Sequence, residues 1–243
     1  MDKYISFFED YISSFDLSDI NLKRKYNHTY RVVDLSEKIS KSLNLSDREV
    51  FLAKIIALFH DVGRFKQYKE FHKYNDIGTM NHAEASVKCL NETGIIDDLE
   101  EKDIVLKAIF NHNKFMLDDS LNKEELLFCK IIRDADKIDI LKLVIQGEIK
   151  MNDYEEEYSE EAVNDLINGK CIDLGKYPRK VDQSLVKIGL VNDINFNYSK
   201  EYILNNKIID KLIDIYKVKN KKEENKLVEL RIKMKERLSD KTC

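Results

Sequence analysis

The stretch that decides the fold is residues 46–64, which read SDREVFLAKIIALFHDVGR. Ser46 and Glu49 form a capping-box pattern, in which the serine accepts a hydrogen bond from a free N–H and the glutamate reaches back. The helix predicted from there is apolar on nearly all sides, runs to His60 and stops near Gly63. A helix that is hydrophobic all round belongs at the centre of a core.

Helical periodicity continues on both sides of this stretch. Apolar residues recur at steps of three and four, so each segment presents one stripe to a core. Residues 64–80 are rich in charged and aromatic side chains and are expected to form a loop. Five inner helices then account for residues 27 to about 150. The other four are expected at His28–Leu43, from the cap Asn81 to Gly94, around Ile104–His112, and from the Asn122/Glu125 capping pattern through Asp136 to Asp139.

Composition supports an all-α fold. The 243 residues are 43% hydrophobic and include seven glycines and one proline. These are too few turn residues for a many-stranded β sandwich or barrel. The formal net charge of -4 gives no basic excess, which excludes a protein that coats duplex nucleic acid. We therefore expect a helical bundle whose anionic ligands are held locally.

A change in composition near Lys150 predicts two domains, 1–150 and 151–243. The second opens with an acidic run and contains Gly169, Gly175 and the single proline, Pro178. We expect it to be a C-terminal helical extension or lid. A short strand around Ile194–Tyr198 is an alternative to helix there. The helical patterns in this part are at 155–167, 181–190, 200–216 and 222–238.

The sequence also indicates a cellular compartment. Four scattered cysteines form no C-x-x-C pair, and the acidic N-terminus does not look like a signal peptide. The longest apolar run, Val50–Phe59, is broken at Lys54 and is too short to span a membrane. We expect a cytoplasmic protein with free thiols that does not span a membrane.

Polar residues gather at the ends of the apolar stripes. Each histidine taken singly is more often a hydrogen-bonded core residue than a ligand. Burying four imidazoles and two carboxylates together without a cation would cost several kcal/mol, so either they do not converge or a metal is present. This ligand set suits Mn or Fe, and also Co, Ni or Zn, and six ligands suit two ions. The residues are His28, His60, Asp61, His82, His112 and Asp136.

These residues resemble the HD-domain superfamily of metal-dependent phosphohydrolases. That family's pattern is a histidine, a His-Asp pair, and a distant aspartate followed by a basic residue. Here these are His28, His60-Asp61 and Asp136-Lys137, within the segments ALFHDVGR (57–64) and RDADKID (133–139). The resemblance covers about residues 20–150 and implies an all-α HD-domain helical bundle.

The resemblance also implies a ligand set. His28, His60, Asp61 and Asp136 would hold a first metal. Asp134 is the rival for the last place, but it lies on another helical face and does not precede the basic residue. Subgroups with a second metal add two histidines, and the segments around His82 and His112 look like theirs. Asp61 would then bridge both ions.

Departures from the patterns of known subgroups disfavour two subgroups of the superfamily. The cyclic-dinucleotide phosphodiesterases follow their His-Asp pair with Ile-Gly-Lys, where this chain has Val62-Gly63-Arg64. The alarmone hydrolases have Glu-Asp three residues after the pair, where Arg64-Phe65 stand here. The six-ligand pattern is most similar to the bacterial diadenosine tetraphosphatases and to the mixed-valence di-iron oxygenases.

Basic residues near the pair favour a phosphorylated substrate, because a guanidinium can hold a phosphate through two hydrogen bonds. Arg64 and Lys137 are expected to bind the phosphate beside Asp61, and these three are the predicted catalytic residues. Lys66 and His72 are further candidates for binding the substrate. The alternative for each is an exposed surface residue with no role in the site. Carboxylates that orient the ligands are predicted at Asp134 or Glu84.

The leading hypothesis is a phosphohydrolase that uses metal-activated water on a nucleotide or another small phosphate ester or anhydride. A di-iron oxygenase on the same fold is one alternative. The other is a non-catalytic, metal-stabilised binding module. In that module the metal would be structural and the C-terminal helices would recognise a protein. Their apolar stripe would pack against a partner helix, including that of a homodimer, or within the chain, and it consists of Leu227, Leu230, Met234 and Leu238.

Overall fold

The computed structural model describes residues 1–151, 154–217 and 219–240, and this part of the chain contains helices and no strand. The all-α prediction is confirmed. The chain divides into two compact units, Met1–Ala135 and Asp136–Cys243, with the boundary inside α7 (Lys123–Ile145). The predicted domain limit near Lys150 stays a prediction.

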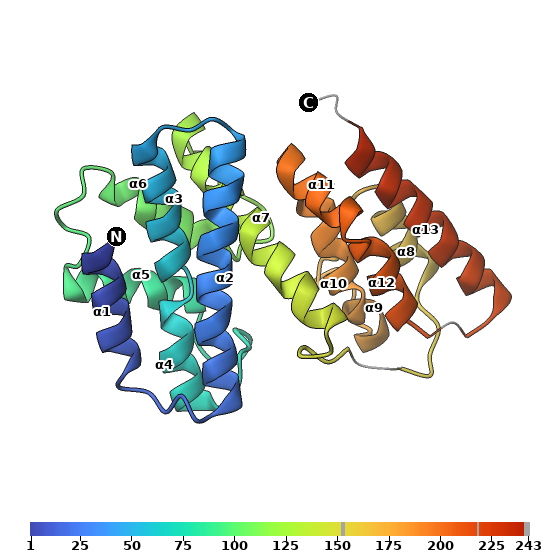
Figure 1. Ribbon diagram of the computed structural model, residues 1–243. Coiled ribbons are helices and arrows are strands. Elements are labelled where there is room, and N and C mark those ends of the chain that lie inside the picture. Colours follow the sequence, from blue (N-terminus) through green and yellow to red (C-terminus); the bar gives the residue numbers. More distant parts are fainter. Residues whose placement is uncertain (152–153, 218, 241–243) are drawn as a thin grey trace. The chain divides into compact units, whose positions relative to one another are not determined.

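The first unit is built around α3. Residues 55 to 59 of this helix are five consecutive buried apolar side chains, each at most 1% exposed, so α3 is covered on every side as its sequence predicts. The Ser46/Glu49 capping box is present at its start. Helix α2 runs antiparallel to α3 and packs along it (Figure 1). The helices of this unit before α7 are α1 (Asp2–Ile12), α2 (Ile20–Ser42), α3 (Asp47–Phe59), α4 (Val62–Phe71), α5 (His82–Thr93) and α6 (Lys102–Asn111).

Helix caps set the ends of the helices that carry the polar residues of the site. The Asn81 side chain accepts hydrogen bonds from the N–H groups of Ala83 and Glu84, and Gly94 ends α5 with a φ of 63°. The Asn122 side chain accepts from the N–H groups at 124 and 125, and Glu125 accepts from the Asn122 N–H at 2.9 Å. Both capping predictions are confirmed. The caps could be predicted from the sequence because each involves residues only two or three positions apart.

The expected loop over residues 64–80 is wrong in its first half. Helix α4 begins at Val62 and continues to Phe71. Its charged side chains hide the helical period, but Phe65 and Gln67 are both 0% exposed and anchor its inner face. This helix is therefore stabilised by burial of its inner face against other helices, which the sequence pattern does not reveal.

The second unit consists of the end of α7, several short helices and one long helix, α13. The expected strand near residues 194–198 is absent from the described chain, because Phe196 is the N-cap of α11 and Asn197 its first residue. Lys207, with a φ of 54°, interrupts the helix expected over 200–216. The helix expected over 155–167 begins only at Glu160, and the one expected over 181–190 is divided, whereas the helix expected over 222–238 is confirmed as α13. The elements are α8 (Glu160–Ile167), α9 (Lys180–Ser184), α10 (Val186–Gly189), the 3-10 helix η1 (Leu190–Asp193), α11 (Asn197–Asn205), α12 (Ile208–Ile215) and α13 (Lys221–Ser239).

The apolar stripe of α13 is buried inside this second unit. Leu227, Leu230, Met234 and Leu238 are between 0% and 8% exposed, and α13 packs on α8, α11 and α12. Arg237 adds a polar tie by donating to Leu166 O at 3.0 Å and to Asn192 Oδ1 at 2.9 Å. The stripe is therefore intramolecular, and the homodimer expected through it loses its basis.

The cysteines and the helix lengths can also be compared with the sequence predictions. Cys89, Cys129 and Cys171 are not in disulfides, and Cys243 lies outside the described residues. No described helix combines the length and the apolar character needed to cross a membrane.

Candidate metal centre

Helix ends orient two of the histidines in the same way. His60 follows α3 and His112 follows α6, each as the C-cap residue with right-handed helical backbone. Nδ1 of His60 lies 2.7 Å from Ala57 O, and Nδ1 of His112 lies 2.6 Å from Ile109 O. Carbonyls in the last turn of a helix lack intrahelical partners, so each ring donates Nδ1–H there. This hydrogen bond fixes the tautomer and leaves Nε2 as the metal-binding atom.

His82 is oriented by a carboxylate instead. It is the first residue of α5, and its Nδ1 lies 2.7 Å from Oδ2 of Asp76. Asp76 also accepts from Arg64 Nη1 at 2.8 Å and from Gln67 Nε2 at 3.1 Å. A carboxylate on the far nitrogen of a ligating histidine fixes the ring and raises its basicity. For His82 the orienting carboxylate is Asp76, and the expectation that Asp134 or Glu84 orients ligands stays a prediction.

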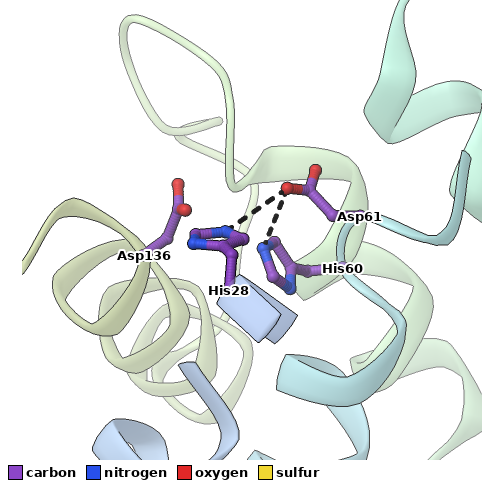
Figure 2. A group of neighbouring side chains, drawn as sticks. All are labelled: His28, His60, Asp61 and Asp136. Carbon is purple, nitrogen blue, oxygen red and sulfur yellow. Dashed lines mark ion pairs between the residues drawn. The ribbon is translucent and has the colours of Figure 1, made fainter. Parts of the chain in front are cut away.

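The first group of possible ligands contains His28, His60, Asp61 and Asp136. Each offers one atom, and these atoms lie within 4.8 Å of one another. Figure 2 shows both imidazole rings with their nitrogens toward the Asp61 carboxylate, and Asp136 beside His28. Asp136 follows Ala135 without a break in α7. Asp134 is fully buried but does not belong to this group.

The second group contains His82 and His112 and shares Asp61 with the first. Nε2 of His82 lies 3.0 Å from Nε2 of His112. These two nitrogens lie 3.5 and 3.6 Å from Oδ1 of Asp61. In the first group, Nε2 of His28 and of His60 lie 3.6 and 3.2 Å from the other oxygen, Oδ2. The two carboxylate oxygens of Asp61 thus face different pairs of histidines.

The donors fit divalent transition metals. Two ligands about 2.1 Å from one ion are about 3.0–3.4 Å apart at tetrahedral or octahedral angles, close to the spacings found here. The four histidines and Asp61 are each at most 4% exposed. Oδ1 of Asp61 is buried and accepts no hydrogen bond in the described chain. Such an atom is costly unless a cation binds it.

The protonation states also suit metal binding. Burial alone would raise the pKa of Asp61, but the Lys25 ammonium and the neighbouring histidines outweigh it and hold the pKa well below its ordinary value. Burial lowers the pKa of His82 to about 4, against the opposing effect of its hydrogen bond with Asp76. At neutral pH the carboxylate is charged and the imidazole is neutral, as metal ligands must be.

The predicted basic residues differ in their surroundings. Arg64 lies against the cluster, with Nε 3.8 Å from Oδ1 of Asp61 and Nη2 3.3 Å from Nε2 of His82. Lys137 is buried, and its ammonium lies 2.7 Å from Oδ2 of Asp193. Lys66 is 53% exposed on its side chain. His72 is exposed, and its left-handed backbone ends α4.

Comparison with known families agrees with the geometry. Residues 26–141 match the family model of the HD domain. This range of the chain is an HD domain. No curated protein and no solved structure gives a significant match. HD domains are commonly metal-dependent hydrolases, and the resemblance inferred from the motifs is confirmed over residues 26–141.

Sequence reasoning missed two residues of this site, Asp76 and Lys25. Asp76 lies in the irregular segment after α4, where no periodicity marks it. Lys25 precedes His28 by three residues on α2, and its ammonium contacts Oδ2 of Asp61. The i, i+3 spacing to His28 is the one sequence signal that pointed to Lys25.

Proposed function

We propose that this protein is a metal-dependent phosphohydrolase that acts on a nucleotide or another small phosphate ester or anhydride. The observation that carries the proposal is the position of Asp61 between two pairs of histidines, with the Arg64 guanidinium beside it. This arrangement favours the dinuclear type. His28, His60 and Asp136 would hold one ion, His82 and His112 the other, and Asp61 both.

Bound divalent ions would supply a water of lowered pKa and neutralise charge on the phosphoryl group. The side chains of the protein would provide orientation. Asp61 would contribute one oxygen to each ligand group, because its two oxygens face different pairs of histidines. Asp76 would hold the His82 ring in place, and buried surroundings would strengthen each electrostatic contact with the substrate.

Arg64 is proposed to bind a phosphate oxygen pair, since a guanidinium matches that geometry. A substrate phosphate must compete there with Asp76, which accepts from the same guanidinium at 2.8 Å. Lys137 is proposed as a second phosphate-binding group, and its competitor is Asp193. Both cations are thus held in position before substrate arrives, which reduces the entropy lost on binding.

The test is hydrolysis by protein loaded with Mn²⁺ or Fe²⁺ and offered a panel of nucleotides and phosphate esters. We expect release of phosphate or of a nucleoside monophosphate. The matched control is Asp61→Asn, which keeps the shape of the side chain and removes its charge; we expect activity to fall by at least about a hundredfold. Metal-loaded wild-type protein that hydrolyses none of these compounds contradicts the proposal, and substrate-dependent oxygen consumption would assign the site to an oxygenase instead.

A further inference from the structure

Lys25 is a cation built into the metal centre. It lies on α2, three residues before His28, so the two side chains share one face of the helix. Its ammonium contacts Oδ2 of Asp61, and the side chain of Lys25 is only 15% exposed. The contact joins the charged end of a long, flexible side chain to the carboxylate that both ligand groups share.

The contacted oxygen is the one that a first ion would need. Oδ2 of Asp61 is also the atom that faces Nε2 of His28 at 3.6 Å and Nε2 of His60 at 3.2 Å. A divalent ion held by these three atoms and an ammonium on the same oxygen would repel each other at close range. The two cations therefore compete for Oδ2.

Aromatic side chains offer the displaced ammonium a second position. Its Nζ lies 5.8 Å from the centre of the Tyr74 ring. The Tyr74 hydroxyl donates to Asn21 O at 3.1 Å, and its ring lies 4.9 Å from that of Tyr68. These contacts hold the ring beside Lys25. The ammonium already lies over this ring, which would still attract it after it left Asp61.

We propose that Lys25 is a positioning residue of the metal centre: its ammonium holds the Asp61 carboxylate between the two histidine pairs until a divalent ion binds, and the first ion must displace it. The inference rests on the metal site of the proposed function and adds how that site is loaded. Lys25 then has two opposite effects. It stabilises the protein without metal, and it weakens binding of the first ion.

The test compares Lys25→Met with Lys23→Met. Lys23 is exposed on the same helix, so its replacement removes the same charge without touching Asp61. Full-length protein is stripped with a chelator and titrated calorimetrically with Mn²⁺. We expect Lys25→Met to bind the first ion about ten- to a hundredfold more tightly than wild type, the factor that one charge-assisted hydrogen bond contributes to an equilibrium. Lys23→Met should stay within about threefold, as expected for a screened surface charge.

Thermal unfolding supplies the second readout. Chelated Lys25→Met should melt below chelated wild type, because a buried carboxylate loses its counter-ion, whereas the two Mn²⁺-loaded proteins should melt together. If Lys25 had only a structural role, its replacement would lower both melting temperatures and would not tighten metal binding. If Lys25→Met does not fold, Lys25→Gln takes its place, because glutamine still donates a hydrogen bond to Asp61 but carries no charge.

Unchanged or weaker Mn²⁺ binding by the Lys25 variant overturns the inference, as does wild-type protein that binds no Mn²⁺. The outcome is independent of any substrate. A protein that shows the expected shift in affinity and hydrolyses no phosphate compound supports the role of Lys25 and refutes the proposed hydrolase activity.

Discussion

Gly63 follows the His-Asp pair closely and lies in tight contact with the first turn of α5, the helix that begins with His82. It is the second residue of α4, and its N–H donates to Ser86 Oγ at 2.9 Å. A Cβ at this position would lie 2.6 Å from Ser86 N, 2.7 Å from His82 O and 2.7 Å from Ala85 Cβ. Two of these three atoms are backbone atoms of α5. The substitution Gly63→Ala therefore cannot be accommodated by rotating one side chain.

The size of the effect follows from these distances. Non-bonded carbon atoms settle at about 3.5 Å, so the first turn of α5 must move by about 0.8 Å. This turn carries His82, whose Nε2 lies 3.0 Å from Nε2 of His112. Metal–ligand distances tolerate deviations of only about 0.2 Å, so the second ion should be lost while the first is kept. Overpacking should also destabilise the protein by about 1–3 kcal/mol, equivalent to about 2–12 °C in melting temperature.

The assay combines thermal unfolding of the chelated protein with metal analysis of the reloaded protein by mass spectrometry. Gly175→Ala is the control, because the nearest atom to its added Cβ is Asp173 Oδ1 at 3.3 Å and its φ is not positive. It should keep the wild-type melting temperature and metal content. If Gly63→Ala does the same, α5 is free to yield at this contact, and the account of how His82 is positioned is refuted.

Three further predictions concern the ligands themselves. His82→Ala and His112→Ala should each lose about one metal ion per chain by elemental analysis, whereas Asp61→Ala should lose both; full metal content in the two histidine variants would make the site mononuclear. Asp76→Asn should weaken binding of the second ion by about 10–100-fold in a calorimetric titration, because the His82 ring loses its orienting carboxylate, and equal affinity would assign Asp76 a purely structural role. Folding lowers the pKa of His82 from 6.5 to about 4, so between these pH values His82 binds a proton in the unfolded chain but not in the folded one. Chelated protein should therefore lose stability as pH drops from about 6.5 to 4. Chemical denaturation across this range should show a smaller slope for His82→Gln, and an unchanged slope would contradict the shifted pKa.

The sequence by itself determined the helices that have local signals. The caps at Ser46, Asn81 and Asn122 depend on side chains within three residues of each helix start, and apolar periodicity identified the central helix α3. The motifs also determined the HD-domain resemblance, because the His-Asp pair and the Asp-Lys pair lie in short, recognisable sequence motifs. Helix α4 escaped prediction because its charged residues conceal the buried positions Phe65 and Gln67, which only tertiary contacts define.

Only the tertiary structure decided which groups meet at the site. The carboxylate that orients His82 is Asp76, contributed by an irregular segment, and the cation on Asp61 is Lys25, contributed by a helix distant in sequence. Lys137, expected to face a phosphate, lies against Asp193, a residue 56 positions later. Caps and periodicity report interactions between residues a few positions apart, whereas these contacts arise from the packing of separate helices. For that reason the chemistry of the ligands could be predicted from the sequence, but the charges that surround them could not.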